Sequence, residues 1–455
     1  MLTQAPDLGL LTVLRDDGSA DPAHDPVLAP ELLLRMWREM KRLRTLEVRM
    51  VTLQRQGRVG FYGSCTGQEA TPIATGFALE PGDWVFPALR ESAIMLVRGF
   101  PLASYVAQVF GNSRDVLKGR QMPSHMSGRQ VNQVSWSSCI GPQIPQAVGA
   151  AHAAKLRGDK VVTVGFMGDG ATSQPDFHAA MTFAARADAP CILVCQNNHW
   201  SISVPTARQT ASQTIAVKAR AYGIPGVRVD GNDVLAIYTV MRDAADRARS
   251  GGGPTFVECV TYRMGAHSTS DDPTRYRSND EVERWAKKDP LDRFERHLRK
   301  TGLLTDAIVK AAEPEIDAEI AAAIDEVEPA APPPQTSLFE DVYAELPSHL
   351  RDQRAELRGT LLTDAELAAV VPPPASDAAL FVEGARVTTA EGQARRVLHL
   401  DDGAGQGRHP GAAIAELSVL VPPPAQRRAG ADAGAGVTVA GDDVDRVGEA
   451  QYRLR

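Results

Sequence analysis

Residues 160–171, with the sequence KVVTVGFMGDGA, decide the fold because an apolar run ends in a Gly-Asp-Gly turn. The β-branched and apolar residues of Lys160–Phe166 predict a buried strand, and Gly168-Asp169-Gly170 is typical of the loop that ends one. A second apolar run, Cys191–Gln196, predicts another buried strand, which leads into Asn197-Asn198. The two strands therefore end in polar residues that suit ligand binding.

Helices and further strands surround these two runs. A helix is predicted at His178–Ala187 between them, and another at Asp233–Arg249 between strands at Gly226–Asp230 and Thr255–Tyr262. This alternation predicts an α/β fold, a parallel sheet with helices on both faces. Since ligands bind at the carboxyl ends of such strands, we expect both polar turns to face one site.

The chain divides into three parts by composition. Residues 1–30 are rich in Pro and Asp and predict an irregular N-terminal arm. Residues 31–358 form the predicted functional domain, which opens with an amphipathic helix at Glu31–Gln56. Its later part includes a charged helical stretch at Asp280–Glu328.

Residues 359–455 differ in character from the rest of the chain. They are dominated by Ala, Gly, Val, Pro, Asp and Arg, lack Lys, and contain Phe381 and Tyr452 as their aromatic residues. Since so few large apolar groups cannot build a core, we expect a disordered, low-complexity tail. A sharper hypothesis is that a frameshift or read-through of a GC-rich gene added this sequence.

The overall composition limits the partners. A formal charge of −7 gives no reason to expect nucleic acid or an anionic membrane as partner. The five cysteines show no metal-type clustering and predict buried, reduced thiols. No run predicts a membrane span, and the acid-rich N-terminus is unlike a targeting peptide. We expect a cytoplasmic protein if the source is a bacterium.

The two polar turns suit a magnesium-bound pyrophosphate. Glycines at 168 and 170 let the backbone approach phosphate oxygens, and the Asp169 carboxylate is a hard ligand for Mg²⁺. Asn198 would offer an amide oxygen from the neighbouring strand end. A Gly-Asp-Gly turn alone is an ordinary turn. The pair at this spacing resembles the pattern of thiamine diphosphate enzymes.

The resemblance extends over Glu31–Arg358. It rests on these segments: Gly67-Gln68-Glu69-Ala70, Leu89-Arg90-Glu91, Gly119-Arg120-Gln121-Met122-Pro123-Ser124-His125, Gln143–Ala150, and Thr261–Asp272. With them the chain resembles the alpha subunits of the heterotetrameric 2-oxoacid dehydrogenase decarboxylases. Gly119–Pro123 is similar to the branched-chain enzymes, whereas pyruvate-specific relatives more often have a Gly-Gly-Ser-Met-His-like stretch there. The segment Gln143–Ala150 agrees with this.

The resemblance implies a set of cofactor ligands. The side chains of Asp169 and Asn198 and the carbonyl of Trp200 would bind Mg²⁺, and Arg90 would contact the diphosphate. The other positions implied to line the cofactor are Leu89, Ser138, Ile140, Gly168, Gly170, Ala171, Gln196 and His267. Two of these depart from the family pattern, because Leu89 replaces a frequent Tyr and Gln196 an Arg. Some relatives bind a potassium ion at the stretch that matches residues 137–143. Whether this chain has that site is left undecided, since Pro142 offers no hydroxyl.

Histidines and serines in polar loops are further candidates. A lone loop His is usually a solvated surface residue, but the resemblance places His267 at the reacting centre, where imidazole suits proton transfer. His125 is the weaker candidate and is expected to be structural. Ser268 and Ser278 match serines that kinases phosphorylate in some relatives, which remains an open possibility here.

The cofactor-activating glutamate has no match in this chain. In heterotetrameric relatives the beta subunit supplies it, so the resemblance implies an α₂β₂ assembly that passes acyl groups to a lipoyl acyltransferase core. The implied substrates are branched-chain 2-oxoacids. Two alternatives remain: the same chemistry on pyruvate or acetoin, and a non-catalytic structural subunit, against which Asp169, Asn198, Arg90 and His267 speak.

Overall fold

The computed structural model describes residues 8–360, 386–388 and 394–396. The chain divides into two compact units, Met1–Leu380 and Phe381–Arg455. In the second unit, β8 (Arg386–Thr388) and β9 (Ala394–Arg396) form an antiparallel pair. We expected residues 359–455 to be disordered, and most of them lie outside the described residues. The described ones are β8, β9 and the end of α12 (Ser348–Thr360).

A five-stranded parallel sheet forms the centre of the first unit. Its strands, in spatial order, are β1 (Trp84–Phe86), β2 (Thr163–Gly168), β3 (Cys191–Asn197), β7 (Thr255–Val260) and β6 (Gly226–Asp230). The predicted α/β class and parallel sheet are confirmed. The strand expected at 160–166 begins and ends later, and β1 was not predicted because three residues give too short a pattern.

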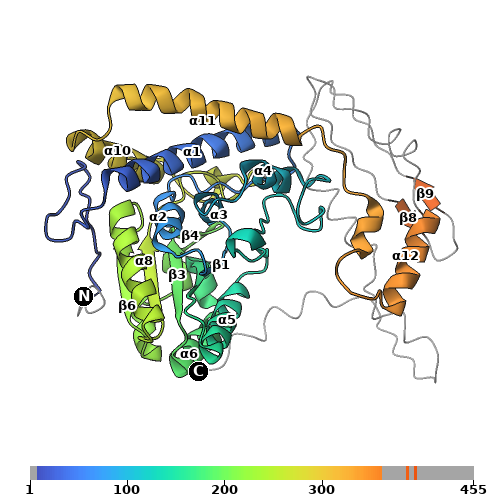
Figure 1. Cartoon of the computed structure of the whole chain (residues 1–455), viewed down its shortest axis with the longest axis horizontal. Coiled ribbons are helices and arrows are strands. Elements are labelled where there is room, and N and C mark those ends of the chain that lie inside the picture. Colours follow the sequence, from blue (N-terminus) through green and yellow to red (C-terminus); the bar gives the residue numbers. More distant parts are fainter. Residues whose placement is uncertain (1–7, 361–385, 389–393, 397–455) are drawn as a thin grey trace, which may run out of the picture. The chain divides into compact units, whose positions relative to one another are not determined.

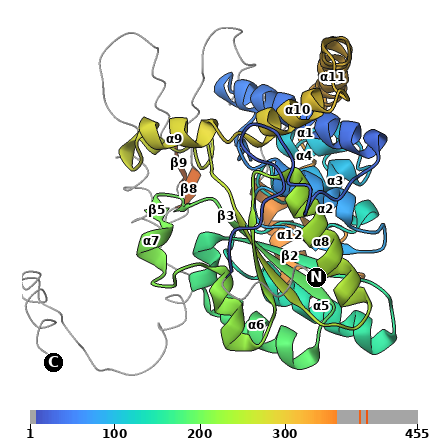
Figure 2. The same ribbon diagram turned by 90° about the vertical axis from the view of Figure 1, so that its left-hand side faces the viewer.

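Helices cover both faces of the sheet (Figure 2). Alternate strand residues, such as Leu193 and Cys195, pack with α5 (Gln143–Arg157) and α6 (Pro175–Ala187). The intervening ones, such as Ile192 and Val194, join the core of the opposite face. That face is covered by the helices α1 (Pro30–Arg55), α2 (Ala70–Ala78) and α8 (Val234–Arg249).

The helices α10 (Pro290–Lys300) and α11 (Asp306–Val327) lie along α1 (Figure 1). The charged stretch expected at Asp280–Glu328 forms three helices because Asp289 and Thr305 cap new starts. They are α9 (Asn279–Ala286), α10 (Pro290–Lys300) and α11 (Asp306–Val327). The remaining elements are α3 (Ala93–Val97), α4 (Leu102–Phe110), α7 (Thr206–Gln209), α12 (Ser348–Thr360), β4 (Trp200–Ser201) and β5 (Val204–Pro205).

The arm at residues 8–29 is irregular but attached to the sheet edge. Leu11 makes an isolated parallel bridge with Val229 of β6. The amides of Val13 and Leu14 both donate to Oδ2 of Asp233, at 2.6 Å each. Asp233 also caps the start of α8. This one carboxylate therefore joins the arm to the body of the domain.

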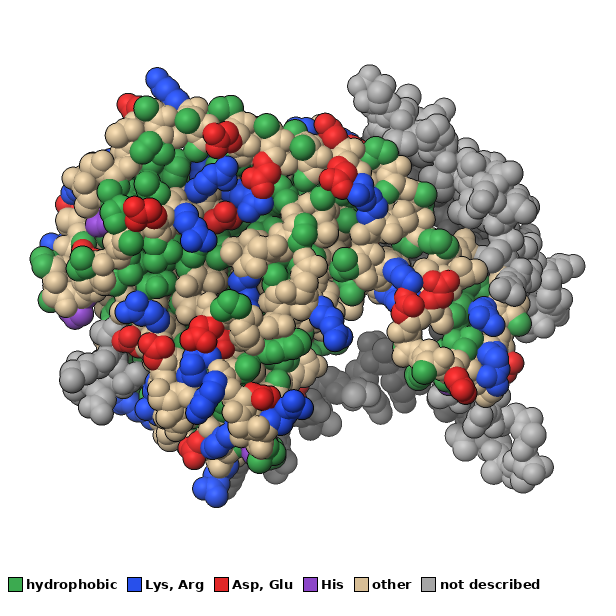
Figure 3. Space-filling model, in the orientation of Figure 1, with side chains coloured by type: hydrophobic (Ala, Val, Ile, Leu, Met, Phe, Trp, Pro, Cys, Tyr) green, Lys and Arg blue, Asp and Glu red, His purple; other side chains and the backbone are tan. Residues whose placement is uncertain are grey.

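Surface and thiol positions bear on the expected partners. On the face shown in Figure 3, acidic and basic side chains are interspersed. Within the described residues, no helix combines the length and the apolar composition that a membrane crossing needs. Four cysteines are buried as expected, but Cys139 is exposed, which corrects the expectation for that thiol because it lies on an open loop.

Candidate cofactor site

A cavity of about 410 Å³ opens where β1, β2, β3 and β7 end. Such strand ends are the usual ligand sites of parallel sheets, and the volume suits a small-molecule ligand. The structure brings every predicted site residue into its wall: Leu89, Arg90, Ser138, Ile140, Gly168, Asp169, Gly170, Ala171, Gln196, Asn198, Trp200 and His267. Ser138 and Ile140 are exposed, whereas Arg90, Asp169 and Asn198 are buried.

The turn after β2 holds a buried carboxylate beside open backbone. Oδ2 of Asp169 accepts hydrogen bonds from Thr206 Oγ1 at 2.9 Å and from Gln209 Nε2 at 3.0 Å. Burial raises the pKa of the Asp169 carboxyl, so a nearby cation would favour its ionised form. A Cβ added at Gly168 would meet no atom within 4 Å, whereas one at Gly170 would collide with Ser201. The backbone is therefore open to a ligand at Gly168, whereas at Gly170 it packs closely against Ser201.

The turn after β3 presents the other expected metal ligands. Oδ1 of Asn198 accepts the Trp200 amide at 3.1 Å, and its Nδ2 donates to Gln68 Oε1 at 3.0 Å. The Trp200 carbonyl lies 3.4 Å from Arg263 Nη1, a long contact that a metal could displace. Among the described residues, no three His, Cys, Asp or Glu side chains form a metal cluster. A metal here would therefore need one carboxylate with amide and carbonyl oxygens, a set that suits Mg²⁺.

A pair of arginines, Arg90 and Arg263, faces His267 in the cavity wall. Arg90 Nη2 donates to the His267 carbonyl at 2.9 Å, and Arg90 and Arg263 each place a guanidinium nitrogen 3.4 Å from His267 Nδ1. Burial, together with the neighbouring Arg263 charge, lowers the pKa of Arg90 to about 10. Burial and both arginines lower the pKa of His267 to about 4. At neutral pH this wall therefore combines two cations with a neutral imidazole.

Gln196 is held by a buried acid and not by a cation. Its Nε2 donates to Glu91 Oε1 at 2.5 Å. Burial raises the pKa of Glu91 to about 7. Gln196 Oε1 is buried without a partner among the described residues. This part of the cavity wall therefore carries a neutral amide and no cation.

His125 and the two serines take different positions. The His125 ring stacks on Trp136 with centroids 3.6 Å apart, and its Nε2 contacts Ser138 Oγ in the cavity wall. His125 also lines the cavity, so the expectation of a purely structural role stays untested. Ser268 is buried, at 8% exposure, whereas Ser278 is exposed. A kinase could therefore reach Ser278 directly, but Ser268 only after movement of its loop.

Several cavity residues did not come from the sequence argument. Gln68, Glu91, Phe61, Trp136 and Arg263 line the cavity and were not predicted as site residues. Gln68 and Glu91 lie within quoted motifs, and Glu91 directly follows Arg90, which was the available signal. Phe61 and Trp136 reach the cavity from separate loops, so sequence spacing alone could not bring them together.

The residues present fit a diphosphate with a divalent cation. The cavity offers a buried carboxylate, an amide oxygen and a carbonyl to a cation. It also offers two guanidinium groups to an anion, and one of them lies 3.4 Å from that carbonyl. Gln68 Nε2 and Gln196 Oε1 are buried polar atoms without partners among the described residues, as expected where a ligand completes the hydrogen bonding. The fold and this cavity define an α/β protein with a site for an anionic cofactor.

The chain belongs to the dehydrogenase E1 component family, whose profile matches residues 38–336. It is 42% identical over 355 residues to a Pseudomonas aeruginosa protein named 2-oxoisovalerate dehydrogenase subunit alpha, covering 76% of this chain and 87% of the relative. It is 40% identical over 347 residues to the mitochondrial subunit of the same name from Bos taurus, covering 76% of each chain. The human subunit is also 40% identical over 347 residues, with coverages of 76% and 78%.

Proposed function

We propose that this chain is the alpha subunit of an enzyme that oxidatively decarboxylates branched-chain 2-oxoacids with thiamine diphosphate and Mg²⁺. The observation that supports it most strongly is the meeting of Asp169, Asn198, Arg90 and His267 in one cavity at the strand ends. Its relatives of 40–42% identity are named as 2-oxoisovalerate dehydrogenase alpha subunits.

The proposed ligand roles follow from the chemistry of each group. Asp169, Asn198 and the Trp200 carbonyl supply oxygens to Mg²⁺, and Arg90 supplies its charge to the diphosphate. The amides of Gly170 and Ala171 are proposed to donate to the same anion, because these residues lie near the start of the 3₁₀ helix Asp169–Ser173 before α6. Leu89, Ser138, Ile140, Gly168 and Gln196 shape the remaining wall. The cofactor, when bound, supplies the electron sink for decarboxylation.

His267 is proposed to donate a hydrogen bond to the substrate. Its Nδ1 lies 3.4 Å from two guanidinium nitrogens, which can only donate, so Nδ1 must be the acceptor. The proton of the neutral ring therefore resides on Nε2. From there the Nε2–H can donate a hydrogen bond to a carboxylate or keto oxygen of a bound 2-oxoacid and so orient it, while the proton stays on the ring.

An apolar part of the cavity wall supports a branched substrate. It consists of Phe61, Leu89, Met122, Trp136 and Ile202. The test is turnover by a reconstituted α/β pair of 3-methyl-2-oxobutanoate against pyruvate. We expect kcat/KM to favour the branched acid by about 10- to 100-fold, since each buried methyl group adds discrimination. Equal or reversed values would move the assignment to pyruvate or acetoin chemistry.

A partner subunit is proposed because two large apolar side chains are exposed on neighbouring helices. Leu156 of α5 is 75% exposed and Phe183 of α6 is 68% exposed. We propose that a beta subunit covers the surface around Leu156 and Phe183 in an α₂β₂ assembly. The beta subunit also supplies the activating glutamate. The assembly then delivers acyl groups to a lipoyl acyltransferase core. Gel filtration with and without a co-expressed beta chain tests the assembly, and we expect the co-expressed chains to elute together as an α₂β₂ complex. In an activity assay we expect the alpha chain alone to be inactive.

The non-catalytic alternative has a direct test. Calorimetry of the α/β pair with thiamine diphosphate and Mg²⁺ should show saturable binding that requires the metal. An absence of heat from a folded pair would favour a structural subunit. The cytoplasmic location, which depends on a bacterial source, stays a prediction, as does phosphorylation of Ser268 or Ser278.

A further inference from the structure

Gln68 is a completely buried residue of the cavity wall, with 0% of its surface exposed. Its position is fixed by the segment before α2. Glu47 Oε1 accepts the Cys65 amide at 2.7 Å, and Glu69 Oε2 accepts the Gly67 amide at 2.9 Å. Two buried carboxylates thus hold the backbone directly before Gln68, so its side chain has little freedom to move.

A chain of three polar groups determines which way the Gln68 amide points. The Trp200 backbone N–H can only donate, and it donates to Asn198 Oδ1 at 3.1 Å. Asn198 Nδ2 must then be the donor toward Gln68, and it lies 3.0 Å from Gln68 Oε1. Nε2 is therefore the remaining polar atom of Gln68, and it has no partner among the described residues.

This unpaired donor needs an acceptor. A buried N–H without a partner costs about 1–3 kcal/mol, so proteins rarely keep one without a reason. A water bound to a metal ion points its hydrogens outward and cannot accept well from Nε2. A phosphate oxygen is a strong acceptor, and the proposed metal ligand Asn198 lies directly beside Gln68.

We propose that Gln68 is an unassigned residue of the cofactor site with two roles. Its Oε1 holds the Asn198 amide so that a lone pair of Asn198 Oδ1 can face the metal. Its Nε2 donates to an oxygen of the diphosphate. The inference rests on the proposed thiamine diphosphate function and adds a residue to that site.

The test uses the full chain purified with its partner subunit, and two variants separate the two roles. Gln68→Met removes both polar atoms at similar volume, whereas Gln68→Glu keeps an acceptor for Asn198 and removes the donor. Calorimetry gives the Kd of thiamine diphosphate at saturating Mg²⁺ and, separately, the Mg²⁺ concentration for half-saturation. Gln108→Met is the matched control, because Gln108 is a buried glutamine outside the cavity wall and its Nε2 donates to the Ser127 carbonyl at 3.0 Å.

We expect Gln68→Met to raise the Kd of thiamine diphosphate about 10- to 100-fold and to raise the Mg²⁺ requirement. Gln68→Glu should raise the Kd without raising the Mg²⁺ requirement, and the control should change neither by more than about threefold. If folded Gln68→Met binds thiamine diphosphate with an unchanged Kd, Nε2 faces only a water. That result overturns the role of Gln68 but not the proposed function. Failure of the wild-type pair to bind the cofactor overturns the proposed function as well.

Discussion

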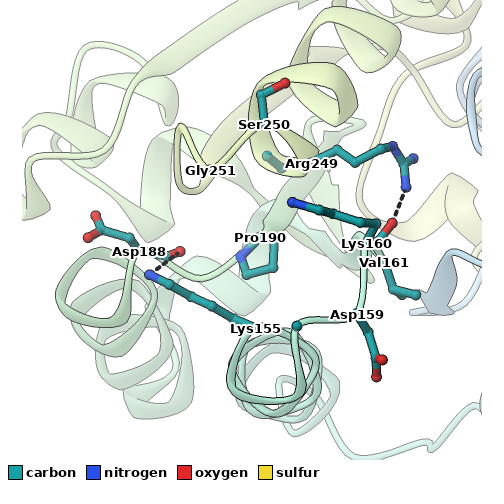
Figure 4. A pocket seen from close by; sticks show the side chains of 11 residues that line it. Lys155, Asp159, Lys160, Val161, Asp188, Pro190, Arg249, Ser250 and Gly251 are labelled. Carbon is teal, nitrogen blue, oxygen red and sulfur yellow. Dashed lines mark hydrogen bonds between the residues drawn. The ribbon is translucent and has the colours of Figure 1, made fainter.

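Two cavities lie at opposite ends of the strands of the same parallel sheet: one at the carboxyl ends, here called the carboxyl edge, and one at the amino ends, here called the amino edge. Their polar groups are arranged differently. The cavity at the carboxyl edge measures about 410 Å³. A recess of about 150 Å³ lies before β2, β3 and β7, at the amino edge, where Lys155, Lys160, Asp188 and Arg249 surround it (Figure 4). Both have basic side chains, so charge alone does not distinguish a ligand site from a structural one.

Two of the cations at the amino edge, Lys155 and Arg249, bind groups of the protein itself. Lys155 Nζ donates to the Ala187 carbonyl at 2.7 Å, where α6 ends. It also donates to the Asp188 carbonyl at 3.2 Å (Figure 4). Arg249 joins Asp83 through two hydrogen bonds and donates to the Lys160 carbonyl at 2.6 Å. Helices end at this edge, so cations there offset exposed carbonyls and the helix dipole. Lys155 and Arg249 therefore brace the protein at the amino edge, whereas at the carboxyl edge Gln68 Nε2 and Gln196 Oε1 face the cavity wall without partners among the described residues.

The largest expected effect comes from neutralising the acid at the carboxyl edge, Asp169, with an acid at the amino edge, Asp188, as the control. Asp169→Asn should weaken Mg²⁺-dependent binding of thiamine diphosphate by more than about 100-fold, since losing a charged metal ligand costs more than losing an outer partner. Asp188→Asn is the matched control, because Asn tolerates the left-handed conformation of Asp188, with φ of 43°. Calorimetry on both variants measures the contrast. Similar binding by the two variants would remove the metal assignment.

Replacing one arginine at each edge should give opposite results. Arg90→Gln should raise the cofactor Kd about 10- to 100-fold, because a charged hydrogen bond to phosphate is lost. Arg249→Gln leaves Asp83, with a side-chain exposure of 0%, without its cation. Since the Val162 and Glu80 amides still donate to that carboxylate, we expect a loss of about 2 kcal/mol in unfolding free energy.

Denaturant unfolding and cofactor titration of the two arginine variants provide the measurement. The Arg249 variant should bind cofactor within about twofold of wild type, because distant sites act independently. Loss of cofactor binding by Arg249→Gln, under conditions where denaturant unfolding shows the variant to be folded, would show that the two edges are coupled. Unchanged binding in Arg90→Gln would contradict the role of Arg90.

The difference between the edges also explains how far the sequence could predict the site. The turn at Gly168–Gly170 and the Asn197-Asn198 pair were predictable because each directly follows a buried run of strand residues. The partner of Asn198 was not, since Gln68 is 130 residues away in the sequence. Similarly, the contact of Arg90 with His267 spans 177 residues. Local patterns predict strand ends, but only packing decides which distant side chains meet there.

The smallest expected effect concerns the pH dependence contributed by His267. Burial and the charges of Arg90 and Arg263 lower its pKa from 6.5 to about 4, so the folded protein binds its proton more weakly than the unfolded chain does. This residue therefore costs no stability above about pH 6.5, and it destabilises the fold progressively as the pH falls toward about 4. His267→Gln should unfold with a shallower loss of free energy between pH 6.5 and 5 than wild type, measured by urea titration without cofactor. Superimposable profiles would mean that the imidazole is protonated as easily in the folded state as in water, and that the arginine wall does not keep it neutral.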